Sequence, residues 1–214
     1  MTEIMQVLEI IGTIAFAVSG ALVAIGTNLD LFGVIFIGTI TAVGGGITRD
    51  IILGIHPPLI FSTPFIFIIS FAVSVIIFIT AYIYRERYDE LRHKIETINN
   101  IFDAIGLAVF SVVGVEVGYT NGFANNELIL VIIGMLTGVG GGIYRDILTD
   151  STPYVLKKHI YAIASIIGSS AYVLLRHNGV DAAVSSAAAM VIIFVIRMLA
   201  TKYEWTLPRI ICKK

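Results

Sequence analysis

Charged residues are scarce in this chain of 214 residues: Asp, Glu, Lys and Arg together make up only 14%, whereas 57% of the residues are hydrophobic. Soluble domains carry about 25% charged residues, so the composition excludes an ordinary soluble domain. The formal net charge of −1 indicates neither a nucleic-acid partner nor a polyanionic one. The single cysteine excludes an intrachain disulfide. The amino terminus also lacks a basic leader of the secretory type, so we expect the first apolar segment to be a retained span.

Long apolar segments account for most of the chain. The mean hydropathy is +0.93, and the individual segments approach the ~20 residues that cross about 30 Å of hydrocarbon as a helix. We therefore predict an all-α integral membrane protein with seven transmembrane helices. The predicted spans are approximately Ile4–Ile25, Leu31–Leu53, Pro64–Tyr84, Ile101–Tyr119, Leu128–Leu148, Ile160–Leu175 and Val180–Ala200.

Lys and Arg residues are distributed unevenly between the two predicted membrane faces. On the face opposite the carboxyl terminus, Arg49 and Arg176 are the only Lys or Arg residues that we count. Because cytoplasmic segments carry the excess of basic residues, we predict a multi-pass protein of the cell membrane with its amino terminus outside and its carboxyl terminus in the cytoplasm. The residues on the cytoplasmic side are Arg85, Arg87, Arg92, Lys94, Lys157, Lys158, Lys202, Arg209, Lys213 and Lys214.

An internal duplication organises the predicted spans. Thr41–Ile51 recurs 96 residues later as Thr137–Ile147, and both copies contain Gly-Gly-Gly-Ile-x-Arg-Asp. Each copy covers three spans, and an odd number of spans makes the second copy enter the membrane from the opposite side, which predicts an inverted repeat. The predicted segments are 1–84 for the first three-helix repeat, 85–100 for a charged cytoplasmic connection, 101–176 for the second three-helix repeat, and 177–214 for the seventh helix and cytoplasmic tail.

The duplication also relates positions outside the glycine motif. At an offset of 94 residues, Glu9 is equivalent to Asp103 and Phe16 to Phe110. The two acids lie near the starts of the predicted first and fourth helices. We expect each of them to stabilise its helix amino terminus or to pair with an Arg of the glycine motif.

Three consecutive glycines are unfavourable inside a helix, because each costs about 1 kcal/mol relative to alanine. We expect a kink or local unwinding at both triplets, and freed carbonyls could replace part of the hydration shell of a cation. The alternative is that the glycines allow two helices to pack closely. Thr41 and Thr137 could add polar groups to a pore, although threonine often bonds its own helix. The predicted pore and kink residues are Gly44, Gly45, Gly46, Gly140, Gly141 and Gly142.

The charged pair after each glycine triplet is costly inside a membrane unless it is paired or hydrated. Neighbouring residues point about 100° apart on a helix, so we expect each to find its main partner elsewhere, with the arginines meeting acids of the other copy. These residues would then line or gate a pore, or they would form fixed ion pairs that join the repeats. The candidates are Arg49, Asp50, Arg145 and Asp146.

Two further polar residues are predicted near the membrane interfaces. Glu116 falls near the outer end of the predicted fourth helix, where it would face the headgroups. Arg197 lies near the cytoplasmic end of the seventh helix, and we expect its long side chain to extend to the interface.

The tandem Gly-Gly-Gly-Ile-x-Arg-Asp on the second and fifth of seven spans resembles the prokaryotic branch of the trimeric intracellular cation (TRIC) channels. This broad family also includes proteins described as bacterial glycine transporters. The resemblance extends from Glu9 to about Ala200. It implies a homotrimer in membrane lipid, with one pore per protomer lined by the second and fifth helices and passing potassium or sodium, and it implies no cofactor. Animal members carry a Lys-Glu-Val lipid-binding element where this chain has Thr48-Arg49-Asp50.

Two transport functions fit the sequence. The first is a monovalent cation channel, in which acids would have to screen the two arginines. The second is a secondary transporter for glycine or another small zwitterion, whose carboxylate would meet an Arg or a half-helix amino terminus, although no second ion site for coupling is evident. An enzyme or a metal centre is not expected, because His-Glu-x-x-His and Gly-x-Ser-x-Gly are missing and the four histidines are scattered.

Overall fold

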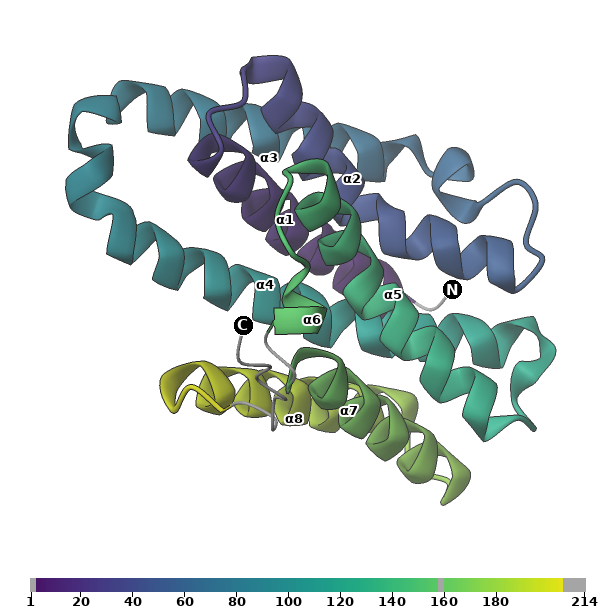
Figure 1. Cartoon of the computed structure of the whole chain (residues 1–214). Helices are drawn as coiled ribbons and strands as arrows, with labels where there is room; N and C mark the ends of the chain where they lie inside the picture. Colours follow the sequence, from purple (N-terminus) through teal and green to yellow (C-terminus); the bar gives the residue numbers. More distant parts are fainter. Residues whose placement is uncertain (1–2, 158–159, 206–214) are drawn as a thin grey trace, which may run out of the picture.

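The computed structural model describes residues 3–157 and 160–205 (Figure 1). Within these ranges the chain is helical, without a strand, and seven helices are long and apolar enough to cross a membrane, as the sequence predicts. The predicted tail beyond residue 205 lies outside the described residues. The long helices are α1 (Glu3–Gly26), α2 (Leu31–Ile52), α3 (Pro64–Ile83), α4 (Tyr88–Gly118), α5 (Glu127–Leu148), α7 (Ile160–His177) and α8 (Ala182–Lys202), and the short ones are η1 (Leu59–Ser62), η2 (Arg85–Arg87), the π-helical η3 (Tyr119–Phe123) and α6 (Tyr154–Lys157).

Local sequence explains where several helices begin. The side chains of Asp30, Asn126 and Asp181 accept hydrogen bonds from backbone N–H groups in the first turns of α2, α5 and α8. These caps satisfy donors that a helix start leaves unpaired. Pro64 occupies the first turn of α3, where its missing N–H costs nothing.

The segment 85–100, predicted as a charged connection between the repeats, is mostly helix. After the single turn of η2, α4 begins at Tyr88 and continues for 31 residues. A helix of that length spans about 46 Å, more than the ~30 Å of hydrocarbon. Hydropathy therefore indicated where the apolar part of α4 begins, near Ile101. The helix itself starts earlier, at Tyr88, and its charged residues precede the apolar part.

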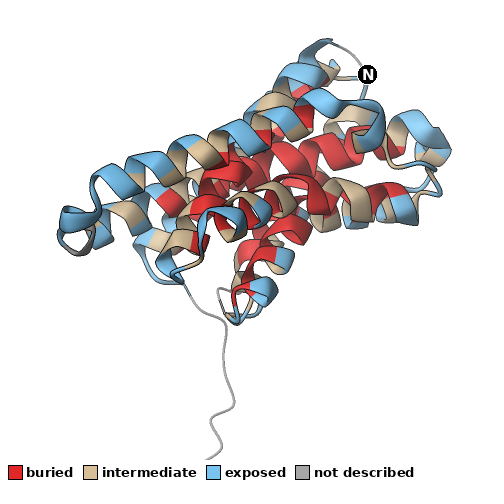
Figure 2. Cartoon of the chain, turned by 90° about the horizontal axis from the view of Figure 1, so that it is seen from above, coloured by how far each residue is buried: buried red, intermediate tan, exposed pale blue. Residues whose placement is uncertain are grey.

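The helices pack as two inverted repeats. In the first repeat α1 packs against α2 and α3, and in the second α4 packs against α5 and α7. The repeats meet through two crossings, α1 with α4 and α2 with α5. The unmatched α8 packs against α7 and α4, so it covers only the second repeat. The buried residues form a continuous region through the middle of the bundle (Figure 2). These contacts confirm the predicted fold of two inverted three-helix repeats with a seventh helix.

The two crossings bring equivalent residues of the repeats into contact. Phe16 and Phe110 stack with ring centroids 5.3 Å apart, and Gly45 lies against Gly141 between α2 and α5. A residue can touch its own counterpart only close to the symmetry axis that relates the repeats. The pseudo-two-fold axis therefore passes through these two contacts, at the centre of the buried region.

The glycine triplets lie within continuous helices. Both α2 and α5 remain helical through their triplets, so the predicted local unwinding is wrong, whereas a kink in either helix remains a prediction. A Cβ atom added at Gly45 would overlap the Thr137 carbonyl oxygen, and one added at Gly141 would overlap the Thr41 carbonyl oxygen. The glycines thus permit a close backbone contact between α2 and α5, which is the packing alternative, and this contact compensates for their low helix propensity.

This contact predicts opposite effects of alanine at neighbouring glycines. Gly45→Ala or Gly141→Ala should destabilise the protein by about 1–3 kcal/mol, because the new methyl group pushes two backbones apart. At Gly46 an added Cβ would meet only Arg49 Nη2, at 3.7 Å. Gly46→Ala should therefore be neutral or slightly stabilising through helix propensity. Thermal unfolding in detergent measures all three, and equal melting temperatures for Gly45→Ala and Gly46→Ala would contradict the packing role.

Candidate functional site

The Arg and Asp that follow each glycine triplet pair directly with each other. Arg49 Nε donates to Asp50 Oδ1 at 2.7 Å, and Arg145 Nε donates to Asp146 Oδ1 at 2.8 Å. All four side chains are buried. The prediction that each would find its main partner elsewhere is wrong for these contacts, since the long Arg side chain folds back far enough to reach its neighbour.

The second oxygen of each Asp holds the segment that follows the helix. Asp50 Oδ2 accepts from the backbone N–H of Leu59, and Asp146 Oδ2 accepts from that of Tyr154, both at 2.8 Å. These residues are the first of η1 and of α6. Each Asp therefore joins the Arg, the end of the glycine helix and the next short helix. The two aspartates are fully engaged in structural contacts in this conformation.

Arg145 makes further contacts that Arg49 lacks. Its Nη1 donates to Asp103 Oδ1 at 2.8 Å and to Ser19 Oγ at 2.7 Å. Ser19 Oγ in turn donates to Asn99 Oδ1 at 2.7 Å. This Asn99–Ser19–Arg145 chain, defined by these two hydrogen bonds, connects α4, α1 and α5. It is one polar link between the two repeats, alongside the Thr48–Tyr144 hydrogen bond between α2 and α5.

The prediction for Asp103 is confirmed in one respect and wrong in another. Asp103 pairs with an Arg of the glycine motif, as one of the two expected roles. It does not cap α4, because that helix begins at Tyr88. Arg145 and Asp103 belong to the same repeat, so the prediction that Arg145 meets an acid of the other copy is wrong. Its contact with the other copy is the hydrogen bond to Ser19.

The threonines before the glycines are buried against neighbouring helices. Thr41 Oγ1 donates to the carbonyl of Ile37, and Thr137 Oγ1 donates to that of Ile133. A Cβ added at Gly20 would lie 2.6 Å from Thr41 Oγ1, and the equivalent distance from Gly114 to Thr137 Oγ1 is 2.5 Å. Neither threonine lines the two cavities described below, so the predicted exposure to a pore is not found in this conformation.

Glu116 and Arg197 lie inside the bundle, whereas the sequence analysis predicted both of them near the membrane interfaces. Glu116 accepts a hydrogen bond from the Tyr172 hydroxyl. Arg197 is 2% exposed, and its guanidinium carbon lies 4.6 Å from the centre of the Tyr161 ring. Both predictions are wrong because α7 and α8 pack over α4 and bury these side chains.

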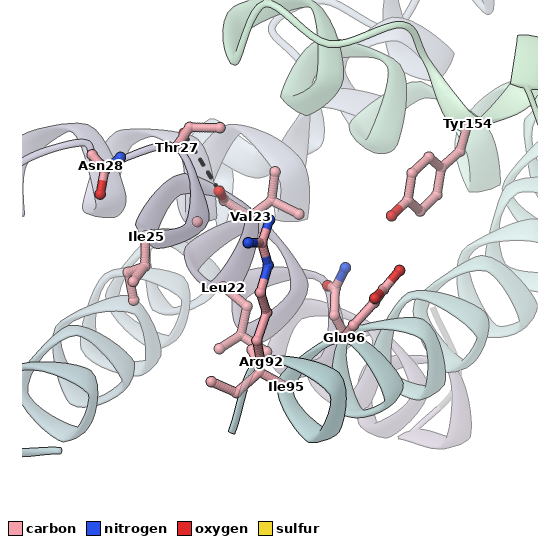
Figure 3. Close-up of a pocket in the computed structure, with 11 residues that line it drawn as sticks. Leu22, Val23, Ile25, Thr27, Asn28, Arg92, Ile95, Glu96 and Tyr154 are labelled. Carbon is pink, nitrogen blue, oxygen red and sulfur yellow. Dashed lines mark hydrogen bonds between the residues drawn. The ribbon is translucent and has the colours of Figure 1, made fainter. Parts of the chain in front are cut away.

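A cavity of about 560 Å³ opens at the carboxyl end of α1. We call it the carboxyl-side cavity; its polar lining includes Arg92, Glu96, Asn99 and Tyr154. Figure 3 shows Glu96 and Tyr154 projecting toward the same space, with Arg92 on the α1 side. Burial raises the pKa of the Tyr154 hydroxyl, with the nearby Arg145 opposing the shift, so this group is neutral near pH 7. Asn99 and Tyr154 connect the cavity to the contacts of Arg145.

A second cavity of about 610 Å³ lies at the amino end of α1. We call it the amino-side cavity, and its lining includes Glu9 and Leu59, the residue whose N–H is held by Asp50. Between the two cavities α1 buries Phe16 and Ser19. Each cavity is therefore lined by a residue that an Asp of one Arg-Asp pair holds, Leu59 for Asp50 and Tyr154 for Asp146. The central contacts of α1 separate the two cavities. A route through the protomer would have to connect these cavities.

Sequence reasoning missed Ser19, Asn99 and Tyr154. The repeat gave no signal for Ser19, because Val113 occupies its equivalent position. Asn99 lies in the segment that was predicted to be a connection. Tyr154 directly follows Pro153, the counterpart of Pro57, and this repeated proline was the available signal for a structured segment. Among the described residues, no group of three or more His, Cys, Asp and Glu is arranged to hold a metal.

The chain matches a known family along most of its length. The model of the family described as Glycine transporter matches residues 6–82 and 100–177. These two ranges fall on the two three-helix repeats. The inner membrane protein YadS of Escherichia coli K12 is 36% identical over 94% of this chain and 93% of its own. The membrane protein YvgT of Bacillus subtilis is 32% identical over 95% of each chain.

Solved structures agree with these sequence matches. A TRIC channel orthologue from Rhodobacter sphaeroides aligns with a TM-score of 0.85 at 30% identity, covering 95% of this chain and 100% of the other. A prokaryotic TRIC channel solved in 0.5 M KCl aligns with a TM-score of 0.82 at 35% identity, covering 97% and 100%. The chain therefore belongs to the Glycine transporter family, and it has the fold of the prokaryotic TRIC channels.

Proposed function

We propose that this chain is a channel for monovalent cations such as potassium, with one pore in each protomer of a homotrimer. The observation that carries the proposal is the pair of cavities at opposite ends of α1, each lined by a residue whose backbone N–H is held by the Asp of one Arg-Asp pair. The likeness to solved TRIC cation channels at 30% and 35% identity supports the same function. The pore would pass between the cavities beside α2 and α5, the helices that carry the glycine triplets.

The arginines are compatible with cation passage because acids neutralise them. Arg49 is paired with Asp50, and Arg145 is paired with both Asp103 and Asp146. A cation near these groups would meet ion pairs, not free positive charges. The Arg-Asp pairs would therefore hold the pore helices in register, and their charge would not exclude potassium.

The conformation described here is a closed one in this proposal. The Asn99–Ser19–Arg145 chain leads from Asn99, in the lining of the carboxyl-side cavity, into the bundle, and the Phe16–Phe110 stack lies at its centre. Passage of an ion would require these contacts to separate. Because Ser19 holds both hydrogen bonds of the chain, we infer that its hydroxyl stabilises the closed state.

The proposed setting is the cell membrane, with the amino terminus outside and the carboxyl terminus in the cytoplasm. The excess of Lys and Arg on the predicted cytoplasmic side supports this orientation. Exposed apolar residues of α3, including Phe65, Ile68 and Phe71, suit contact with lipid or with another subunit. The proposed role is transport without an enzymatic reaction, a cofactor or a nucleic-acid partner.

The alternative function is a secondary transporter for glycine or another small zwitterion. The description of the matching family supports it. In that case an Arg of the glycine motif would bind the substrate carboxylate. Arg145 is buried with three partners and has only Nη2 without one among the described residues. It would have to release a partner first, so the geometry favours the channel.

Purified protein in liposomes should pass potassium down its gradient without saturable uptake of glycine. An entrapped potassium indicator measures the first, and labelled glycine measures the second on the same vesicles, with protein-free vesicles as the control. Saturable glycine counterflow with negligible potassium flux would overturn the channel and establish the transporter.

Ser19→Ala should raise potassium flux through the same vesicles. The change removes both hydrogen bonds of the Asn99–Ser19–Arg145 chain, so the closed state loses about 1 kcal/mol of stabilisation or more. Ser74→Ala is the matched control, because it also removes a buried hydroxyl, one that bonds only within α3. Equal flux in both variants would show that Ser19 does not hold the closed state.

Asp103→Asn should lower the free energy of unfolding by about 3–5 kcal/mol, because it breaks an ion pair in which both side chains are fully buried. Asp30→Asn makes the same chemical change at an exposed helix cap, where asparagine is equally suitable. Thermal unfolding of both variants measures the difference. Similar melting temperatures would mean that Asp103 is not a structural anchor.

A further inference from the structure

The carboxylate of Glu9 has no hydrogen-bond or ion-pair partner among the described residues. Its side chain lines the amino-side cavity, and no hydrogen bond or ion pair within 3–157 and 160–205 engages its carboxylate. The charged groups that act on it are Arg49 and Asp50, and these two are already paired with each other. An ionisable residue inside a membrane span without a partner is costly, and such residues are usually functional.

The equivalent acid of the second repeat has an ion-pair partner, which Oδ1 of its carboxylate engages. Asp103 accepts from Arg145 at 2.8 Å and is completely buried, whereas Glu9 is only partly buried and faces a cavity. The two positions therefore share an origin and differ in what they bind. The difference shows that repeat symmetry does not require Glu9 to pair with Arg49.

The charged groups around the two equivalent arginines, Arg49 and Arg145, also differ between the repeats. Around Arg145 there are two acids, Asp103 and Asp146, and a second buried cation, Arg197, which contacts the Tyr161 ring from α8. Tyr161 lies within the electrostatic reach of Asp103, Arg145 and Arg197, so two cations balance two acids.

The first repeat lacks that second cation. Arg49 is paired with Asp50, and Glu9 lies within the electrostatic reach of both. With Glu9 ionised, these three groups carry one negative charge in excess. The helix α8 covers only the second repeat, so it provides no counterpart of Arg197 here. A bound monovalent cation would supply the missing charge.

The amino-side cavity offers oxygen atoms around this acid. The hydroxyls of Thr63 and Thr120 donate to backbone carbonyls, and so does the side-chain amide of Asn121. Thr120 Oγ1 also accepts a long hydrogen bond from Asn121 Nδ2, at 3.5 Å. Each of these oxygens keeps at least one lone pair for a ligand beside Glu9 and Gln6 in the cavity lining. Carboxylate, hydroxyl and amide oxygens suit a hard cation or an ammonium group.

We propose that the amino-side cavity binds one monovalent cationic group against Glu9. The shared chemistry fits a potassium ion or the ammonium group of a small amino acid. The site rests on the proposed function, since it would form one end of the permeation route. The occupant takes the electrostatic place that Arg197 has in the second repeat.

Binding of radioactive rubidium, as a stand-in for potassium, and of labelled glycine to the purified protein in detergent tests this site. We expect saturable binding of one probe, weakened about tenfold or more in Glu9→Gln, the size of a lost charge contact. Glu3→Gln makes the same change at an exposed position of α1 and should bind like the parent. Rubidium binding that potassium displaces identifies the metal ion, and glycine binding identifies the ammonium group.

A second variant keeps the test decisive if Glu9→Gln fails to fold. Gln6→Lys places a permanent ammonium group one helical turn from Glu9, where it can pair with the acid, and it should abolish binding of either probe. Equal binding in Glu9→Gln and the parent, or unchanged binding in Gln6→Lys, would overturn the site. Because binding is measured without a gradient, an absence of flux in liposomes would count against the proposed channel and not against this site.

Discussion

The rest of the structure depends on the close contact between α2 and α5 at Gly45 and Gly141. Each glycine lies against a backbone carbonyl of the other helix, so neither helix can carry a side chain there. In a bilayer no hydrophobic effect drives helices together, and van der Waals packing at small residues must hold them. The contact lies near the pseudo-two-fold axis, and it therefore fixes how the two repeats face each other. The Arg-Asp pairs follow within two turns and inherit their positions from it.

The buried charges serve the same arrangement. In a low-dielectric interior an unpaired charge is costly, and the chain satisfies Arg49 and Arg145 with the adjacent Asp in each case. The free oxygen of each Asp then holds the backbone of η1 or α6. One dipeptide thus neutralises an arginine, ends a glycine-containing helix and positions the next segment. This combination accounts for the recurrence of the motif without requiring that its charges touch an ion.

Hydropathy and internal repetition were enough to predict the spans and the inverted repeat, because both follow from periodic, local properties of the chain. The charged first part of α4 was not predicted, because hydropathy detects the apolar part of a helix and not the whole helix. An Arg of the glycine motif was predicted as one possible partner of Asp103. The roles of Ser19 and Asn99 were not predicted, because their hydrogen bonds depend on the crossing of α1, α4 and α5. The glycines were assigned to a kink because helix propensity is readable from sequence, whereas the carbonyl of Thr137 against Gly45 is a property of packing alone.

The unmatched helix α8 explains why two equivalent repeats need not have equivalent functions. It packs on α4 and α7 and buries Arg197 beside Tyr161, and in this way it closes and balances the second repeat. The first repeat has no such cover, and its counterpart acid, Glu9, remains beside an open cavity. An inverted duplication creates two similar half-sites, and a single added helix is then sufficient to make one of them a fixed anchor. The other half-site keeps an acid beside a cavity, and this is the place where we propose that a cation binds.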